Sequence, residues 1–433
     1  MDNNQGNRGL LGLLMAILCL YGIALVCSMA AMEILSWATF ATLLYAFYIK
    51  KIDVETNYKH FLPALALFGW CALGALGKGF PPNRLEYAFG DFRWIVLLFS
   101  FTVAIEHLLK NKTLSHQRMI KIWQWTILCL LLFITLYSIV QYFYGIDIVR
   151  STRMSTAIEE NGRVVRWRPR GLFSMPLTFA YSLAMTLMCL FPSLAKLSSS
   201  ERNPISILSL FVGLLGIIAI LLSFTRGAWI AFGVGLGLIL ILRGSARTII
   251  GAFSLAVVTV VVSISSSPFL RYRILSIFDS NHLSNLERTY IWTAYFQMFR
   301  DNPLFGVGYN IDGFQLAGYL EKMAVTIEYP GHAHNNYLQF LSTTGVGGFL
   351  LYLALIFYFL VLNFRLIKKL PRNSLFGRIS VSLLAAQVVF HIGGMTECTF
   401  FDAELRHFLI FTWAWVLALT GYFKNGETTV AAA

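Results

Sequence analysis

The sequence predicts an all-α protein that crosses a membrane many times. Of its 433 residues, 57% are hydrophobic and only 13% are charged, and the mean hydropathy is +0.66. Soluble proteins carry about a quarter charged residues. The apolar segments are about 20 residues long, which is the length of a membrane-spanning helix, whereas the strands of a membrane barrel are about half as long and alternate in polarity. We therefore expect a helical bundle joined by polar loops.

Twelve apolar segments are predicted to span the membrane. The seventh and eighth are joined by 224–227, which is short enough to be a tight reversal. The pattern divides the chain into residues 1–266 with nine spans, a large, partly helical loop at 267–337, and residues 338–433 with three spans and a tail. The predicted spans are about 10–28, 30–49, 61–77, 92–109, 121–144, 172–191, 204–223, 228–242, 248–266, 338–362, 376–394 and 405–422.

The chain has a net charge of +13, and its lysine and arginine residues are distributed unevenly over the loops. Short loops and ends with 18 of these residues form one side, which the positive-inside rule places in the cytoplasm with both termini. The loops 78–91, 145–171, 267–337 and 395–404 then lie outside. Of the 16 basic residues on the outer side, 14 are arginine. Arginine either stabilises these loops or binds an anionic ligand through its fork of donors, and the count alone leaves both interpretations open.

Two arginines lie at the mouths of predicted spans. Arg226 stands between two apolar segments, where an ionisable side chain is costly and is a functional candidate by default. The alternative is an interfacial anchor beside Trp229. Arg170 is followed directly by Gly171 and the next span, so the same argument applies to it. The other arginines of 145–171 also fit a solvated face near lipid headgroups.

The large outer loop is predicted to contain an amphipathic helix over 286–299. An apolar stripe with helical spacing runs from Ile291 to Phe299, and Arg288 lies on a neighbouring face. Asn302 precedes a proline and is expected to end the helix. A helix with such a stripe lies on the membrane or caps the bundle.

A histidine-rich stretch closes this loop just before a predicted span. Asn335 is placed to cap the helix that follows. The dipole of that helix disfavours an imidazolium at its start, so a neutral His332 or His334 is suited to accept a proton. Two histidines at i, i+2 also resemble metal ligands, but no cysteine, third histidine or paired carboxylate nearby completes a set. The six cysteines show no C-x-x-C spacing. We therefore expect neither a metal nor another cofactor.

These residues resemble the O-antigen ligase and polymerase superfamily of bacterial envelopes. Its motif is a histidine, then Asn, Ser or Gln, nine residues and a glycine. Here the motif consists of His334, Asn335, nine residues and Gly345. The similarity continues in 223–229, which reads Ser-Phe-Thr-Arg-Gly-Ala-Trp, and in the Glu-Arg pair that ends at Arg288. The layout of the spans agrees over most of the chain.

The resemblance implies a polytopic glycosyltransferase of the C type in the bacterial inner membrane, with its active site facing the periplasm. The donor would be O-antigen polysaccharide on undecaprenyl pyrophosphate. The acceptor would be a sugar hydroxyl of lipid A–core in a ligase, or another lipid-linked repeat unit in a polymerase. Membrane lipids would surround the protein, and nucleic acid is not an expected partner. A transporter or flippase is the rival class, although few ionisable residues fall inside the spans.

The resemblance, taken with the chemistry of the side chains, predicts roles for individual residues. His334 is expected to be the general base for the acceptor hydroxyl, and Arg288 is expected to be catalytic as well. Arg226, Arg288 and Arg170 are expected to contact the donor pyrophosphate, whose developing charge fixed cations stabilise. The expected supporting residues are Asn335, His332 and Tyr337. No metal ion is expected to take part.

Overall fold

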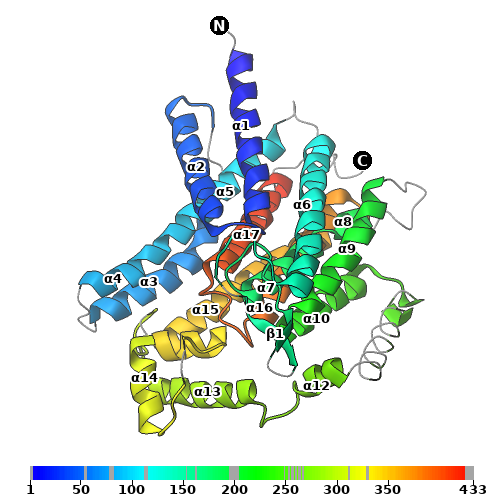
Figure 1. Ribbon diagram of the computed structural model, residues 1–433. Coiled ribbons are helices and arrows are strands. Elements are labelled where there is room, and N and C mark those ends of the chain that lie inside the picture. Colours follow the sequence, from blue (N-terminus) through cyan, green and yellow to red (C-terminus); the bar gives the residue numbers. More distant parts are fainter. Residues whose placement is uncertain are drawn as a thin grey trace.

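The computed structural model describes residues 3–52, 56–77, 82–111, 116–152, 154–160, 163–194, 204–247, 249–251, 254, 258, 261, 265, 268–310, 313–327 and 331–424. Within them nearly all regular structure is helical, and the two strands form one short antiparallel hairpin (Figure 1). The expectation of an all-α membrane protein is confirmed.

The elements follow one another along the chain in this order. The first half contains α1 (Asn3–Ala24), α2 (Met29–Tyr48), η1 (Tyr58–Phe61), α3 (Leu62–Gly77), α4 (Pro82–Phe89), η2 (Gly90–Phe92), α5 (Arg93–Lys110), α6 (His116–Tyr144), β1 (Thr156–Glu160), β2 (Arg163–Trp167), α7 (Pro176–Met188), α8 (Phe191–Leu194), α9 (Pro204–Leu222) and α10 (Arg226–Arg243). The second half contains α12 (Pro268–Leu275), α13 (Leu283–Asp301), α14 (Gly313–Lys322), α15 (Asn336–Lys369), α16 (Leu375–Gly393) and α17 (Ala403–Lys424).

Nine helices of the described part are long and apolar enough to cross a membrane, and each overlaps a predicted span. Three predicted spans are not among the nine. The first corresponds to a shorter apolar helix, Gly9–Ala24, within α1. The predicted span at 248–266 lies largely outside the described residues. The last corresponds to α17, a helix of 22 residues. The total of twelve spans therefore stays a prediction.

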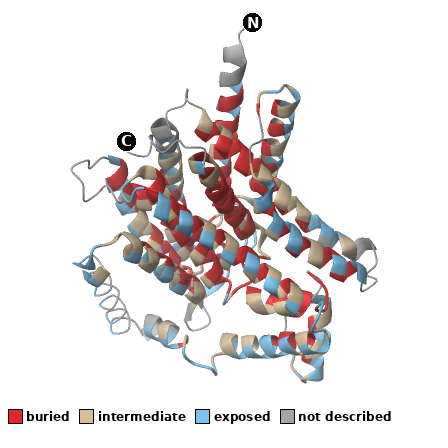
Figure 2. Cartoon of the chain, turned by 180° about the vertical axis from the view of Figure 1, so that it is seen from behind, coloured by how far each residue is buried: buried red, intermediate tan, exposed pale blue. Residues whose placement is uncertain are grey.

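Helix α17 lies at the centre of the bundle. It packs against α5, α7, α15 and α16, and every residue from Leu405 to Leu419 is buried (Figure 2). A helix that is apolar on all sides is typical of such a position. The charged Arg406 is tolerated there because its guanidinium donates to the Asp91 carboxylate at 2.6 Å.

Helix α15 is interrupted where the sequence motif has its glycine. Gly345 has a φ of 67° and a ψ of −173°, which are not helical values. The loop after α13 fits into this break, and the N–H of Val307 donates to the carbonyl of Ser342 at 2.9 Å. A Cβ on Gly345 would overlap the Leu304 carbonyl of that loop. Glycine is needed here both for the positive φ and for the close approach of the two backbones.

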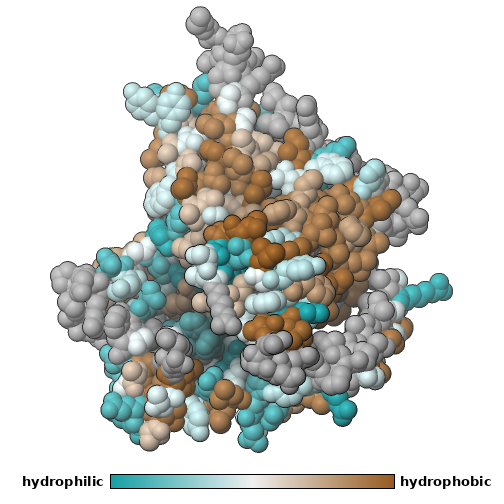
Figure 3. Space-filling view, viewed as in Figure 1, coloured by the Kyte–Doolittle hydropathy of each residue, from teal (hydrophilic) through white to brown (hydrophobic). Residues whose placement is uncertain are grey.

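The helices of the large loop gather at one end of the molecule. Helices α12, α13 and α14 lie opposite the start of α1 (Figure 1), and hydrophilic atoms are concentrated towards this end (Figure 3). The buried residues of α13 are Ile291, Ala294, Tyr295 and Met298, and they form one stripe with helical spacing. Because α13 packs against α14 and α15, this stripe caps the bundle.

Candidate functional site

The histidine stretch adopts a sharply turned backbone before α15. Ala333 is fully buried, its N–H donates to Gln339 Oε1 at 2.9 Å, and its carbonyl accepts from Trp292 Nε1 at 2.9 Å. His334 has a φ of +48°, in the left-handed region that residues other than glycine rarely occupy. Local strain of this kind costs on the order of 1–3 kcal/mol and persists where surrounding contacts impose it. The result is that the His332 and His334 rings lie 4.4 Å apart, centroid to centroid.

Glu397, from the loop between α16 and α17, lies against both histidines. Its two carboxylate oxygens are 3.0 and 3.1 Å from Nδ1 of His334. One of them is 3.4 Å from Nε2 of His332 and also accepts the backbone N–H of Cys398 at 3.0 Å. The Glu397 residue is only 6% exposed, so these contacts replace its hydration.

The contacts within this cluster favour an ionised Glu397 carboxylate and a neutral His332 imidazole. Burial by itself favours the neutral acid of Glu397, but the hydrogen bond from His334, the charges of the two imidazoles and the Cys398 N–H together hold the pKa of the carboxyl below its usual range. Burial also lowers the pKa of His332, against the opposing effect of Glu397. A carboxylate at Nδ1 of His334 favours the tautomer with the proton on Nδ1. The lone pair of that ring is then on Nε2.

A polar cavity opens beside this pair and encloses about 970 Å³ of space, its mouth included. Helices α7, α10 and α13 contribute to its wall, together with loop residues on both sides of them. The polar part of its lining consists of Arg168, Tyr181, Thr225, Arg226, His282, Ser284, Glu287, Arg288, His334 and Glu397. The structure therefore brings together three residues that the sequence analysis singled out, Arg226, Arg288 and His334.

Arg226 is the first residue of α10, so this helix begins inside the reversal that the sequence predicts at 224–227. Its guanidinium donates to the carbonyl and hydroxyl of Ser276 at 2.6 and 2.9 Å and to Asn285 Oδ1 at 3.2 Å. These contacts fix the cation at the cavity wall. The adjacent Gly227 is required by packing, because a Cβ there would overlap Tyr181 and Thr396.

Arg288 projects from α13 into the same cavity and is half-buried. Among the described residues its guanidinium makes no hydrogen bond, so its five N–H donors are available to a ligand. Arg168, at the end of the hairpin, also lines the cavity. It is oriented by hydrogen bonds to the carbonyl of Ser223 at 3.0 Å and to Thr225 Oγ1 at 3.4 Å.

Arg170 is not among the residues that line this cavity. It is 6% exposed, and its Nε donates to Asp147 Oδ2 at 2.7 Å. Its Nη2 donates to the carbonyl and hydroxyl of Thr152 at 2.8 and 3.0 Å. Its own N–H donates to Gln141 Oε1 at 3.1 Å. The side chain thus ties the 145–175 segment together, and its predicted contact with a pyrophosphate stays a prediction.

The three predicted supporting residues have different positions. His332 contacts Glu397, as described above. Asn335 caps α15, accepting the N–H groups of Tyr337 and Leu338 at 2.9 and 3.1 Å, as the sequence suggested. Tyr337 is not among the residues that line the cavity, and its hydroxyl donates to the His391 carbonyl at 3.1 Å.

Sequence reasoning missed Glu397 and Tyr181 and gave Arg168 little weight. Glu397 lies in the short loop predicted at 395–404, on the same side as the histidines. An acidic residue in that loop could therefore have been proposed as a partner of the histidines, although no sequence spacing links it to His334. Tyr181 lies inside a predicted span, where an aromatic residue is most often part of the core.

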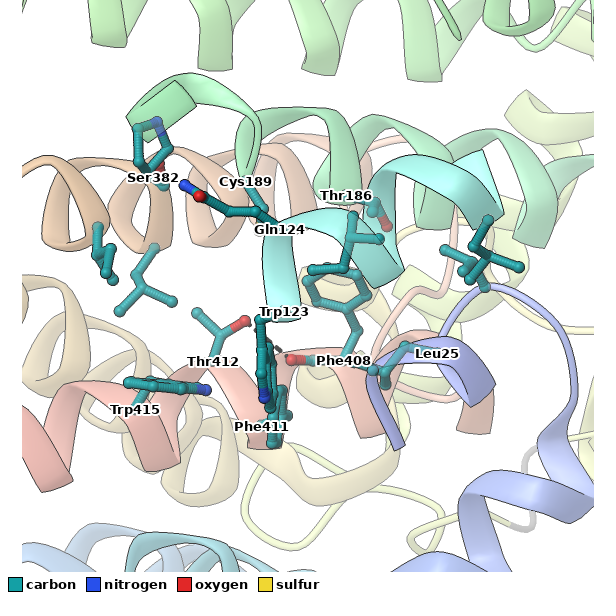
Figure 4. Close-up of a pocket in the computed structure, with 17 residues that line it drawn as sticks. Leu25, Trp123, Gln124, Thr186, Cys189, Ser382, Phe408, Phe411, Thr412 and Trp415 are labelled. Carbon is teal, nitrogen blue, oxygen red and sulfur yellow. Dashed lines mark hydrogen bonds between the residues drawn. The ribbon is translucent and has the colours of Figure 1, made fainter. Parts of the chain in front are cut away.

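A second cavity of similar size, also about 970 Å³, has a different character. Trp123, Phe411 and Trp415 point towards one another in it (Figure 4), and the rings of Trp123 and Phe411 stack with centroids 5.6 Å apart. Its lining, as far as the described residues define it, contains neither an arginine nor a carboxylate. It therefore lacks the groups needed for acid–base or phosphate chemistry.

Comparison with known proteins gives one family. Residues 211–353 match the family model described as O-antigen ligase, and this segment contains Arg226, Arg288 and His334. A solved structure titled "Structural coordination of polymerization and crosslinking by a peptidoglycan synthase complex" contains a chain with a TM-score of 0.45 and 14% identity, over 87% of this chain and 100% of that chain. A similarity of this size carries no functional argument. No curated protein matches the chain.

Proposed function

We propose that this chain, whose residues 211–353 match the O-antigen ligase family model, transfers O-antigen polysaccharide from undecaprenyl pyrophosphate to a sugar hydroxyl of lipid A–core. The observation that supports this proposal most is the cavity itself. It combines a histidine–carboxylate pair with three arginines, Arg168, Arg226 and Arg288. One half suits an acceptor hydroxyl and the other suits a pyrophosphate.

In the proposed reaction the acceptor oxygen attacks the anomeric carbon of the donor sugar. The bond from that carbon to the pyrophosphate oxygen breaks, and its electron pair stays on the pyrophosphate. Nε2 of His334 takes the proton of the acceptor hydroxyl, while Glu397 holds the ring by Nδ1 and stabilises the imidazolium that forms. Direct displacement inverts the anomeric centre. The energy comes from the pyrophosphate linkage, and no metal ion is needed.

The arginines stabilise charge that develops on the leaving group. Arg226 is fixed by its bonds to Ser276 and Asn285, so it does not have to reorganise during the reaction. Arg288 supplies an open fork of donors that matches phosphate oxygens in pairs. Arg170 is proposed to act indirectly, by holding the segment that carries Arg168. The direct contact that the sequence suggested for Arg170 stays a prediction beside this role.

The proposal also includes a location. The protein sits in the bacterial inner membrane with the cavity facing the periplasm and both termini in the cytoplasm. This orientation follows from the distribution of basic residues over the loops. It gives the cavity access to lipid-linked sugars in the outer leaflet of that membrane.

Reconstitution tests the proposed function most directly. Purified protein in vesicles is supplied with lipid-linked O-antigen and lipid A–core, without a nucleotide. We expect polysaccharide joined to lipid A–core. Elongated lipid-linked chains would instead identify a polymerase, which the presence of Arg168 in the cavity makes the second candidate. Movement of the lipid without any transfer would identify a flippase and overturn the proposal.

The His334→Ala variant tests the base. General-base catalysis is worth about 10²–10⁴-fold, so we expect transfer to fall by at least that factor while the protein still accumulates in the membrane. His60→Ala is the matched control, because that imidazole contacts Tyr358 away from the cavity. Near-normal transfer by the His334→Ala variant would rule out the proposed base.

A further inference from the structure

We propose that His332, His334 and Glu397 also form a binding site for a divalent transition-metal ion such as Zn²⁺, and that the bound ion switches off the base. The inference rests on the proposed function, because it concerns the same histidine. The sequence offered the two histidines as possible ligands but no third ligand near them. The third ligand, Glu397, is 63 residues away from His334 in the chain.

The positions of the ligand atoms fit such an ion. One nitrogen from each histidine and one oxygen of Glu397 all lie within 4.8 Å of one another. The Glu397 oxygen is 3.0 Å from Nδ1 of His334 and 3.4 Å from Nε2 of His332. Tetrahedral zinc with bonds of about 2.0–2.1 Å places its ligand atoms about 3.4 Å apart. The three groups therefore need only small side-chain movements to bind it.

The chemistry of the three ligands points to zinc or a similar ion. Two imidazoles and one carboxylate form a set that zinc uses when it keeps a fourth position open. The carboxylate is already oriented by the N–H of Cys398, which is the kind of outer contact that metal ligands usually have. Mg²⁺ and Ca²⁺ prefer oxygen ligands and are expected to bind poorly.

Binding at His332 has a small, identifiable cost. Its Nδ1 now accepts the N–H of His334 at 3.2 Å, which leaves the ring proton on Nε2. A metal at Nε2 moves that proton to Nδ1, so this long hydrogen bond is lost. One weak hydrogen bond is worth about 1 kcal/mol, which is small beside the bonds to the ion.

The bound ion removes the base by fixing the tautomer of His334. Without metal, Nδ1 carries the proton and donates it to Glu397, so Nε2 has a free lone pair. With metal on Nδ1, the neutral ring carries its proton on Nε2. That nitrogen can then no longer accept the proton of an acceptor hydroxyl. Metal binding and general-base catalysis at His334 therefore exclude each other.

Binding is measured first, on the purified full chain without donor or acceptor. Calorimetric titration with Zn²⁺ alone is expected to give one ion per chain, and Co²⁺ is expected to give the visible absorption of a four-coordinate site. In the transfer assay, activity is expected to fall in step with zinc occupancy and to return when EDTA is added. The absence of binding, inhibition that EDTA does not reverse, or stimulation by zinc would each overturn the inference.

Two variants assign the effect to these ligands. His332→Gln removes one of three ligands and is expected to weaken zinc binding at least about tenfold, a loss of about 1.4 kcal/mol. The ratio of rates with and without zinc is taken within each variant, so differences in basal activity cancel. His282→Gln is the matched control, because His282 lines the same cavity outside the three ligands. An equal loss of zinc affinity in both variants would refute the assignment.

The two proposals fail in different ways. A chain that transfers polysaccharide but does not bind zinc retains the proposed function and loses this inference. A chain that binds one zinc through His332 but transfers nothing to lipid A–core retains the metal site and loses the proposed function.

Discussion

Two buried carboxylates of this molecule are used differently. Asp147 and Glu397 both lie in loops, with side chains only 3% and 8% exposed, and both pair with a nitrogen at 2.7–3.0 Å. Asp147 pairs with Arg170, whose guanidinium is also bonded to Thr152. Glu397 pairs with His334, whose ring lines the polar cavity. We call the Asp147–Arg170 pair closed because neither residue lines the cavity, and its role is to stabilise the fold. The Glu397–His334 pair is open because both residues line the cavity, so it can exchange a proton with a bound ligand.

Replacing each carboxylate by its amide tests this contrast, and the largest effect on activity is expected at Glu397. Glu397→Gln removes the charge that stabilises the imidazolium, so we expect kcat to fall by about 10²-fold or more with little change in KM. Asp147→Asn is the matched change in the closed pair and is expected to alter kcat by no more than about threefold, because that pair lies away from the cavity. Steady-state transfer rates of both variants check the prediction.

Glu397→Asp separates a role in catalysis from one in packing. It keeps the charge but shortens the side chain, so it is expected to recover part of the activity that the amide loses. If Glu397→Asp is as inactive as Glu397→Gln while both variants melt like the wild type, charge at this position is not what supports the base.

Arg288, which faces the cavity, and Arg170, which is paired with Asp147, give the next contrast. In Arg288→Lys the charge remains but the fork of donors is lost, so we expect transfer to fall by about 10²-fold, the usual cost of one donor at a developing anion. In Arg170→Lys we expect a reduced melting temperature and only a few-fold loss of transfer. Donor turnover and thermal melting are measured on both variants. The reverse pattern would restore Arg170 as a direct contact of the pyrophosphate.

Much of this site could be predicted from the sequence because its residues lie beside recognisable elements. Arg226 interrupts two apolar runs, His334 precedes one, and Arg288 lies on a helix with a clear apolar stripe. Each signal is local, and the structure places all three around one cavity. The cap at Asn335 was predictable for the same reason, since it depends only on the residues that follow it.

The remaining features depend on contacts between distant segments. The pairing of Glu397 with His334 requires the packing of α16 against α15, and hydropathy does not encode that geometry. The burial of Arg170 requires Asp147 to fold back onto it. The reason for Gly345 is likewise tertiary, because the Leu304 carbonyl occupies the space of its missing side chain. The sequence motif predicts a glycine at this position but not the backbone contact that requires it.

Arg166, in β2, and Arg168, just after it, extend the comparison to two arginines that are close in the sequence. Arg168 lines the cavity, so Arg168→Lys is expected to reduce the transfer rate about tenfold. The loss is limited because Arg226 and Arg288 still provide guanidinium donors in the cavity. Arg166 instead lies over the Phe143 ring, 4.8 Å from its centroid, so Arg166→Lys is expected to be nearly neutral. Initial rates at saturating donor compare the two. Equal losses would mean that the position of Arg168 at the cavity gives its guanidinium no special role.

The smallest expected effect is the dependence of stability on pH. Burial alone would raise the pKa of Asp147, but the N–H of Val149 and the hydrogen bond from Arg170 hold it below its usual value, and the pKa of Glu397 is also lowered. A lowered pKa in the folded state means that the folded protein resists protonation more than the unfolded chain. The stabilisation is therefore complete above the unfolded value of about 4 and is lost as the pH falls through the folded value.

Thermal melting of the two amide variants then separates charge from packing. At pH 7 we expect Asp147→Asn and Glu397→Gln each to be less stable than the wild type by on the order of 1–3 kcal/mol, the cost of removing one partner of a buried charged hydrogen bond. The difference is expected to hold down to about pH 5 and to shrink below pH 4, because the wild-type carboxyls then become protonated as well. A difference that stays constant at acid pH would mean that the amide disturbs packing. The closed and the open pair would then have to be distinguished by activity alone.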